Sequence, residues 1–453
     1  MGVTMNFQEN KMGTHKIIPL LISMSLPPTI SMLTSSLYNI VDSIFVAKLG
    51  NNALTAISLA FPIQILIVAL AVGSGVGVNS YISRQLGEKN FILANNAALH
   101  SIILSFIHYV FLSILGIIFI KPFFYIFTKN MEILNMTSSY TYIVTFLSFG
   151  IITHINIEKI LQATGNTLTP MFLQMIGAGT NIILDPIMIY GYFGFPKLGI
   201  KGAAIATICG QSIALLCSFY VLLYKKQEIK INLKNFRWNT DIIKKIYSVA
   251  IPSFFIISMG SFMVMGINYI LSAISSLAVS IFGIYYKLQT FIYMPTNGIT
   301  QGAMPIMGYN YGAKNKKRLL ETLNYSMIIC IIINFLGTII FWFFPKNILN
   351  LFNTSLEMIN IGVPALKIIS LSFIFGSICF IFTCLFQAIG KGFISFLITF
   401  LRQFIFLIPL AFILGKIFYL EGVWISFTIS ELMTCILSLL IYKYYSKRDK
   451  VLK

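Results

Sequence analysis

Charged residues are scarce in this chain. They make up 10% of its 453 residues, whereas 57% are hydrophobic. A soluble domain has about a quarter charged residues, so the composition excludes an ordinary soluble protein. The short alternating segments of a membrane β-barrel are missing as well. We therefore expect an all-α protein that crosses a membrane many times.

Patterns of known enzymes are missing too. The chain has no HExxH, no CxxC and no Ser–His–Asp arrangement, and its six cysteines have apolar neighbours, which predicts small buried side chains. Gly73, Gly75 and Gly77 lie in an apolar stretch without the features of a phosphate loop, so they predict close helix packing. His100 and His108 are expected to be hydrogen-bonded structural residues. We expect no enzymatic activity.

Twelve apolar stretches are long enough to cross the hydrocarbon core of a bilayer, which takes about 20 helical residues. They are residues 17–47, 54–83, 92–120, 134–160, 168–191, 199–224, 246–272, 277–308, 319–344, 358–387, 393–415 and 422–445. The first stretch is too long for the core of a signal peptide, so we expect it to remain as a membrane helix.

The net charge of +19 is unevenly distributed. Twelve spans put both ends of the chain on one side, and twenty-one lysines and arginines fall on that side against seven on the other. This bias predicts that both termini are cytoplasmic. Anionic lipid headgroups are sufficient partners for the charge, and its distribution argues against a nucleic-acid partner.

The second half of the chain repeats the first at a constant offset of 225 residues. Corresponding positions include Pro27 and Pro252, Gly73 and Gly298, Gly77 and Gly302, Gly87 and Gly312, Lys89-Asn90 and Lys314-Asn315, and Gly165 and Gly390. Six spans per copy make the repeats parallel, as in transporters whose two lobes rock about a central path. We expect an N-terminal six-helix lobe over residues 1–224, a basic linker over 225–245 and a C-terminal six-helix lobe over 246–453.

Three polar positions of the first copy are apolar in the second. The pairs are Asp42 and Ile267, Asn181 and Phe406, and Asp185 and Leu410. A carboxylate in the middle of a membrane helix costs roughly 2.5–3.5 kcal/mol. Folding of the second copy proceeds without polarity at these positions, so the acids of the first copy indicate a function.

The polar residues of the first copy have the chemistry of a cation site. Asn181 and Asp185 are four residues apart and share a helix face. Pro186 cannot donate to the carbonyl group one turn earlier, which leaves a further oxygen near the carboxylate. With Asp42 and Thr207 they would form an all-oxygen cluster, which a hard cation such as Na⁺ prefers. Two close carboxyl groups in a low dielectric can instead share a proton, so the residues allow either ion.

Other charged residues also lie within predicted spans. Arg402 and Glu431 are expected to pair between the last two helices. Lys287 either extends toward the membrane surface or points into a central cavity, and the pair Glu158-Lys159 has no role that the sequence suggests. The residues expected to line a substrate cavity are Tyr38, Met259, Met263, Met265, Lys287 and Met294.

Several motifs resemble those of the multidrug and toxic compound extrusion (MATE) family of the MOP superfamily, and the resemblance covers nearly the whole chain. They are Tyr38-Asn39-Ile40-Val41-Asp42-Ser43-Ile44-Phe45-Val46, Gly87-Glu88-Lys89-Asn90, Gln162-Ala163-Thr164-Gly165-Asn166-Thr167-Leu168-Thr169-Pro170, Asn181-Ile182-Ile183-Leu184-Asp185-Pro186, Lys201-Gly202-Ala203-Ala204-Ile205-Ala206-Thr207, Gln301-Gly302-Ala303-Met304-Pro305 and Gly308-Tyr309-Asn310-Tyr311-Gly312-Ala313.

This resemblance implies twelve helices in two lobes and export of a substrate in exchange for Na⁺ or H⁺. It places Asp42, Asn181, Asp185 and Thr207 at the family's cation-coupling positions, where they would be the metal ligands if the ion is Na⁺. The chain has no mid-membrane acid at such positions in the second lobe, which is similar to the bacterial DinF- and MepA-like branch. We therefore expect a multi-pass protein of a bacterial cytoplasmic membrane.

The leading functional hypothesis is a secondary active multidrug efflux antiporter for amphipathic, often cationic compounds. One alternative is a flippase of the same superfamily for lipid-linked oligosaccharide or other anionic cargo, and another is an uncoupled channel. The expected partners are the small-molecule substrate and membrane lipids. We expect a monomer with no cofactor other than the coupling ion.

Overall fold

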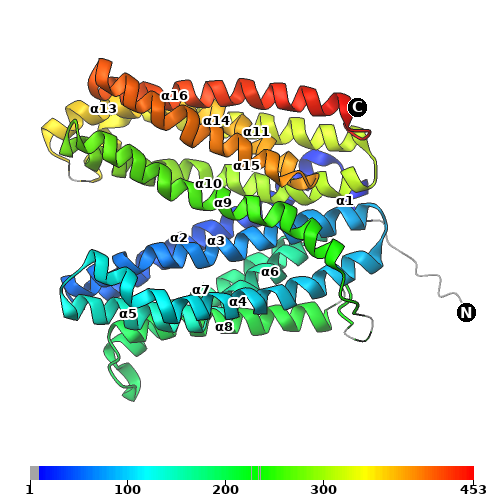
Figure 1. Cartoon of the computed structure of the whole chain (residues 1–453), viewed down its shortest axis with the longest axis horizontal. Helices are drawn as coiled ribbons and strands as arrows, with labels where there is room; N and C mark the ends of the chain where they lie inside the picture. Colours follow the sequence, from blue (N-terminus) through cyan, green and yellow to red (C-terminus); the bar gives the residue numbers. More distant parts are fainter. Residues whose placement is uncertain (1–9, 226, 233, 235, 353) are drawn as a thin grey trace, which may run out of the picture. The chain divides into compact units, whose positions relative to one another are not determined.

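The computed structural model describes residues 10–225, 227–232, 234, 236–352 and 354–453, and this part of the chain is helical without strands. Lys226, one of the basic linker residues, lies outside the described residues. Figure 1 shows the elements, which are α1 (Lys11–Thr14), α2 (Ile17–Ala47), α3 (Asn51–Gly87), α4 (Phe91–Phe127), α5 (Met131–Phe146), α6 (Phe149–Ala163), α7 (Leu168–Tyr190), η1 (Tyr192–Gly194), α8 (Ile200–Tyr224), α9 (Thr240–Ser272), α10 (Ser276–Gly312), α11 (Lys316–Phe343), α12 (Pro345–Asn350), α13 (Leu356–Ser370), α14 (Ser372–Ala388), α15 (Gly392–Phe400), η3 (Leu401–Leu407) and α16 (Ile408–Arg448).

The twelve stretches predicted to span the membrane lie in these helices. Within the described residues, eight helices are long and apolar enough to cross a bilayer by themselves, or ten if each of two bent pairs forms one span. The bent pairs are α5 with α6, at 46°, and α13 with α14, at 41°. One further predicted span is α10, which has 37 residues but is less apolar because it contains Lys287 and Gln289.

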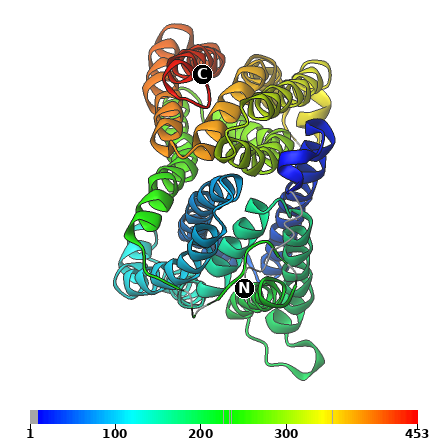
Figure 2. The same cartoon turned by 90° about the vertical axis from the view of Figure 1, so that its right-hand side faces the viewer.

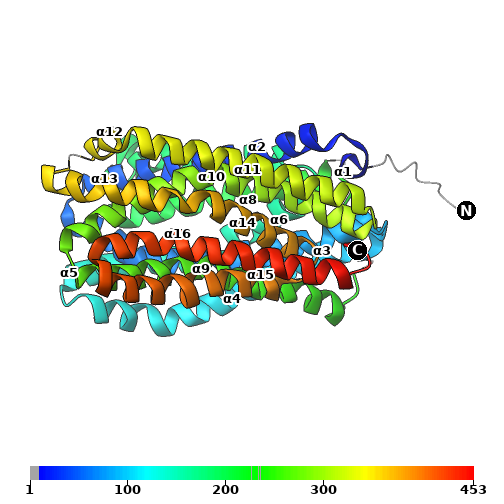
Figure 3. The same cartoon turned by 90° about the horizontal axis from the view of Figure 1, so that it is seen from above.

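The last two predicted spans share one helical stretch, Gly392–Arg448. Its backbone leaves helical geometry at Phe418 and at Tyr419, where φ is 52°. A side chain on Gly422 would lie 2.5 Å from the carbonyl carbon of Leu414, so the segments before and after the break pack on each other. The chain reverses here, and Figures 1 and 3 show the orange and red segments running back side by side. Two spans are therefore present.

The two halves of the chain fold alike at the predicted offset. Adding 225 to the first residues of α3, α4 and α5 gives those of α10, α11 and α13. Lys89 and Lys314 both have positive φ, at 60° and 56°. The residues after them, Asn90 and Asn315, each cap the following helix through a side-chain oxygen that lies 3.2 Å from a backbone N–H. The repeat is thus present in local geometry as well as in sequence.

The chain forms two compact units. One, called the N-terminal unit below, contains Ile30–Leu86 and Asn90–Phe254, and the other, the C-terminal unit, contains Met1–Thr29, Gly87–Lys89 and Phe255–Lys453. In Figure 2 many helices of each unit are seen nearly end-on, as a bundle. Helices α2 and α9 are each divided between the units at the same repeat position, two residues after Pro27 in α2 and two after Pro252 in α9.

The repeated glycines allow helices to cross closely inside each unit. In the N-terminal unit, a side chain on Gly73 of α3 would lie 2.8 Å from the backbone nitrogen of Phe254 in α9. In the C-terminal unit, a side chain on Gly302 of α10 would lie 2.5 Å from Oγ of Ser25 in α2. Gly77 is similarly pressed against α9. The prediction that Gly73 and Gly77 serve helix packing is therefore confirmed.

Candidate functional site

Three of the four residues predicted to form the cation site, Asn181, Asp185 and Thr207, lie on α7 and α8, two helices that approach closely. They meet at Gly177 and Gly210, where a side chain on Gly210 would lie 2.6 Å from the carbonyl oxygen of Gly177. One turn further along α7, Nδ2 of Asn181 lies 3.2 Å from Oδ1 of Asp185 and 3.4 Å from Oγ1 of Thr207. The close approach of the two backbones thus brings these three polar side chains together.

Helix α2 supplies the fourth predicted residue, Asp42. Its carboxyl group lies next to that of Asp185, close enough for the two to form a hydrogen bond when one of them is protonated. The two residues are 9% and 0% exposed. The structure therefore gathers Asp42, Asn181, Asp185 and Thr207 into one buried cluster within the N-terminal unit.

Tyr190 joins α2 to α7 close to this cluster. Its hydroxyl donates to the backbone carbonyl of Phe45 at 2.6 Å, and the two rings meet edge to face with centroids 6.3 Å apart. Phe45 follows Asp42 by three residues, so the bond fixes the part of α2 that carries the carboxyl group. Tyr38, one turn before Asp42, is half-buried.

Three oxygen atoms of the cluster lack a hydrogen-bond partner: Oδ1 of Asp42, Oδ1 of Asn181 and Oδ2 of Asp185. A buried polar atom without a partner costs about 1–3 kcal/mol, which a bound cation would offset. Within the described residues no three His, Cys, Asp or Glu gather into a metal cluster. A cation here would therefore rest on two carboxyl groups and neutral oxygens, a donor set that suits a hard ion.

The corresponding place in the C-terminal unit is apolar. Ile267, the counterpart of Asp42, is fully buried in a hydrophobic cluster that also contains Leu407 and Ala411. These aliphatic side chains have no oxygen or nitrogen atom that could bind a cation or a proton. The structural asymmetry of the two units therefore matches the asymmetry of the sequence.

The residues predicted to line a substrate cavity are dispersed. Met259, Met263 and Met294 are buried within the C-terminal unit, and Met263 belongs to its hydrophobic cluster. Met265 is 66% exposed, and Lys287 is exposed as well. Met263 and Met265 are two residues apart on one helix and so point to nearly opposite sides. The structure does not bring the four methionines to one surface.

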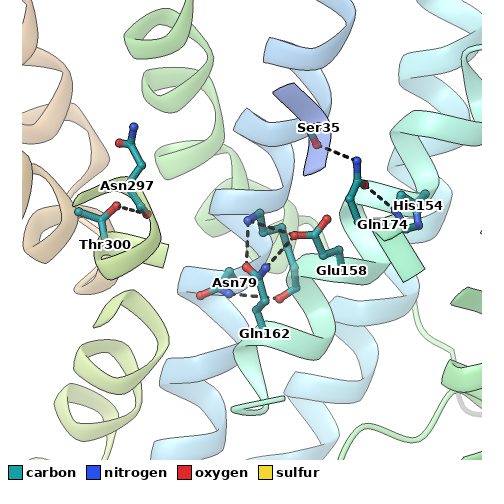
Figure 4. A network of polar contacts seen from close by, with 9 residues as sticks. Ser35, Asn79, His154, Glu158, Gln162, Gln174, Asn297 and Thr300 are labelled. Carbon is teal, nitrogen blue, oxygen red and sulfur yellow. Dashed lines mark hydrogen bonds and ion pairs between the residues drawn. The ribbon is translucent and has the colours of Figure 1, made fainter. Parts of the chain in front are cut away.

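Glu158 and Lys159 belong to a polar network on α6, drawn in Figure 4. Nζ of Lys159 donates to Oε1 of Gln162 at 2.9 Å, and Nε2 of Gln162 donates to Oε1 of Glu158 at 2.7 Å. Asn79 of α3 donates to the backbone carbonyl of Lys159 at 3.2 Å. This network was not predicted from the sequence, although the four-residue spacing of Glu158 and Gln162 is a signal for it.

Arg402 and Glu431 form the predicted ion pair, with Nη1 of Arg402 3.6 Å from Oε1 of Glu431. Arg402 stands on the π-helical segment η3 and also lies over the ring of Phe380, 4.9 Å from its centroid. The pair joins the last two predicted spans inside the C-terminal unit, as expected from the sequence.

The two histidines of α4 are hydrogen-bonded, as predicted. Nε2 of His100 lies 3.0 Å from the backbone N–H of Asn239, which fixes the end of the linker to α4. Nε2 of His108 lies 2.7 Å from the hydroxyl of Tyr247 on α9. Both contacts lie within the N-terminal unit and support a structural role.

Comparisons with known proteins agree with this architecture. The MatE family model matches residues 27–187 and 252–413, one match in each copy of the repeat. The multidrug export protein MepA of Staphylococcus haemolyticus is 28% identical over 438 residues, which cover 96% of this chain and 95% of that protein. The FAD transporter of Shewanella oneidensis is 28% identical over 425 residues and 91% of each chain.

A solved structure of a MOP superfamily transporter from Pyrococcus furiosus has the same fold. It is 27% identical, aligns with a TM-score of 0.89, and the alignment covers 95% of this chain and 96% of that one. The match to the family model covers more than half of this chain. The protein is a multi-pass membrane protein, and it belongs to the MatE family.

Proposed function

We propose that the protein is a secondary active antiporter that exports amphipathic, often cationic compounds in exchange for Na⁺ or H⁺. The observation that carries the proposal is the pair of adjacent buried carboxyl groups, Asp42 and Asp185, each of which has one oxygen without a hydrogen-bond partner. Transporters of the same family named for multidrug export align over nearly the whole chain, which supports the substrate class.

The cluster suits ion coupling because its charge depends on what it binds. A proton bound between the adjacent carboxyl groups of Asp42 and Asp185 would remove one negative charge and join them by a hydrogen bond. A sodium ion replacing that hydrogen would need both carboxylates together with oxygens such as those of Asn181 and Thr207. Either ion would alter the contact between α2 and α7. One charge crossing a potential of 100 mV supplies about 2.3 kcal/mol to drive export.

The test is efflux of a cationic dye from proteoliposomes on which Na⁺ and H⁺ gradients are imposed separately. Uphill movement of the dye under one gradient and its loss when that gradient is dissipated would support the proposal and identify the ion. Downhill flux that is equal under every gradient would show an uncoupled channel instead.

Export of an anionic compound is the second candidate. Lys287 is exposed on α10, one relative is an FAD transporter, and the Pyrococcus furiosus transporter is described with a binding pocket of reversed polarity that suggests a different function. Flavin dinucleotide or a phosphate-bearing lipid-linked oligosaccharide loaded into the same vesicles would distinguish the two. Gradient-driven export of the anion without export of the dye would favour this candidate.

We further propose that the protein works as a monomer in a bacterial cytoplasmic membrane with both ends of the chain inside. The uneven distribution of lysine and arginine supports this orientation. Reporter fusions at Lys453 and in the loop between α7 and α8 should report opposite sides of the membrane. The same side for both fusions would contradict the topology.

A further inference from the structure

An open pocket of about 600 Å³ lies at the end of the C-terminal unit where α11 begins and α16 ends. In Figure 1 this is the end at which the C-terminus is marked. Lys316 and Leu320 of α11 form one wall, and Tyr442, Ser446 and Lys447 of α16 form another. Small-molecule sites in proteins have volumes of roughly 300–1,000 Å³. The pocket is therefore large enough to hold a ligand.

The residues after α16 form a third wall of this pocket. Asp449, the first of them, accepts a hydrogen bond of 2.9 Å from Nζ of Lys391, which fixes the turn that follows the helix. Leu452 is 3% exposed and lines the pocket. Nζ of Lys316 donates to the backbone oxygen of Lys453, so the segment reaches from α16 to the start of α11. The pocket is thus bounded by packed and hydrogen-bonded residues.

The charge of the pocket is positive. The described residues that line it include three lysines, Lys316, Lys447 and Lys453, but no aspartate or glutamate. None of these lysines forms an ion pair with an acidic side chain in the part of the chain that the structure describes. Asp449 is close in sequence, but it is paired with Lys391. The lysine side chains therefore favour an anionic ligand.

The residues around the pocket indicate that it lies at the depth of the lipid headgroups. Tyrosine is enriched where membrane helices meet the interface with water, and α16 has Tyr442, Tyr444 and Tyr445 shortly before its end. Leu439 lies three residues before Tyr442, so the two share a face of the helix. It is 47% exposed on an apolar, membrane-spanning stretch. A lipid headgroup in the pocket would therefore leave its acyl chains beside this apolar face.

We propose that the pocket binds an anionic phospholipid of the surrounding membrane, with the phosphate group between Lys316 and Lys447. The orientation proposed above puts this end of α16 on the cytoplasmic side, where basic pockets between membrane helices bind lipid headgroups of this kind. A free phosphate compound would use the lysines but not the apolar surfaces of Leu320 and Leu439, so a lipid matches the pocket better. The site lies in the C-terminal unit, separate from the cation cluster.

The experiment measures lipid binding to the purified full-length protein in detergent by native mass spectrometry. The two probes are dioleoylphosphatidylglycerol, which is anionic, and dioleoylphosphatidylcholine, which has the same acyl chains and no net charge. The unmodified protein should bind the anionic lipid more tightly. Lys316→Gln combined with Lys447→Gln should weaken binding of that lipid about tenfold and leave the uncharged lipid unaffected. Ser446→Trp fills the pocket without changing its charge and should also weaken binding of the anionic lipid.

A matched pair of lysines distinguishes the pocket from a general attraction of lipid to a basic surface. Lys317→Gln combined with Lys450→Gln removes the same charge from neighbouring exposed positions that do not line the pocket, and it should leave lipid binding nearly unchanged. Thermal unfolding without lipid should be the same for all variants.

Two results would overturn the inference: equal losses of anionic lipid in the two double variants, or equal affinity of the unmodified protein for the two lipids. Displacement of bound phosphatidylglycerol by glycerol 3-phosphate would also overturn it and identify a soluble phosphate compound as the ligand. None of these measurements involves transport, so the proposed function and this inference can fail independently.

Discussion

Asn181 donates a hydrogen bond of 3.2 Å to Asp185 one turn later on α7, and each side chain leaves an oxygen without a partner. The amide holds one carboxylate oxygen through its nitrogen and thereby presents its own oxygen to the same buried space. Asp42 approaches from α2, and its carboxyl group lies next to that of Asp185. Binding of a proton or a cation would stabilise this site, because buried oxygens without hydrogen-bond partners raise the free energy of the folded protein.

Replacing either acid with its amide should abolish ion-driven export. Asp42→Asn and Asp185→Asn keep the size of the side chain but remove a charge, so we expect uphill dye efflux from proteoliposomes to fall at least tenfold while membrane insertion stays normal. Asp241→Asn, at the exposed start of α9, is the matched control. Full pumping by both cluster variants would refute the coupling assignment.

Close helix crossing predicts different effects for two glycines of α10. Gly302→Ala would press a methyl group against Ser25 and the backbone of Met24, so we expect a loss of about 1–3 kcal/mol of stability, as for overpacked cores. Gly283→Ala has open space and should be neutral or stabilising, since alanine favours helix by about 1 kcal/mol. Thermal unfolding in detergent measures the stability of both variants. Equal melting temperatures for Gly302→Ala and Gly283→Ala would contradict the packing argument.

The ion pair of Arg402 and Glu431 should be costly to break from one side. Glu431→Gln leaves the guanidinium group without its partner, and removing one member of a buried pair costs about 3–5 kcal/mol. The double variant Arg402→Met with Glu431→Leu should recover most of that loss, because no unpaired charge remains. A double-mutant cycle on thermal stability measures the coupling, and purely additive effects would exclude it.

Asp449, beyond the end of α16, should stabilise the fold in a pH-dependent way. Burial raises its pKa, but hydrogen bonds from Lys391 at 2.9 Å, the N–H of Val451 and the hydroxyl of Tyr311 outweigh this and leave the pKa below its usual value. A carboxyl group with a lowered pKa adds stability that is complete above its unfolded value of about 3.9. That stability is lost as the pH falls through the lower folded value.

We therefore expect Asp449→Asn to lower stability by about 1 kcal/mol at neutral pH. The difference from the unmodified protein should shrink below about pH 4. Unfolding measured across pH 3–8 provides the comparison, with Glu421→Gln, an exposed carboxylate of the same unit, as the control. A difference that stays constant over the whole range would contradict the role of the charge.

Much of the fold could be predicted because duplication makes the chain its own comparison. The offset that aligns Lys89 with Lys314 also aligns their positive φ angles and the caps that follow. Likewise, the spacing of Asn181 and Asp185 predicted a shared face, and the structure shows them bonded. Such features depend on helical periodicity, which is local and therefore readable in the sequence.

The methionine lining could not be predicted in the same way. Composition indicated that Met259, Met263, Met265 and Met294 were available but not which side of each helix they occupy relative to its neighbours. Met263 faces the hydrophobic cluster of its unit, while Met265 is exposed. Residue type alone does not distinguish a packed side chain from one on an open surface.

The sequence by itself determined that this protein is a duplicated helical membrane protein with acids in one copy, because composition, periodicity and the constant offset are properties of the chain. The tertiary structure decided which of those acids meet and which stay accessible. Asp42 reaches Asp185 across more than a hundred residues of chain, and Gly75 of α3 leaves room for the side chain of Lys159 on α6, whose ammonium group forms an ion pair with Glu158. Both outcomes follow from which helices pack together, and helical periodicity carries no information about that choice.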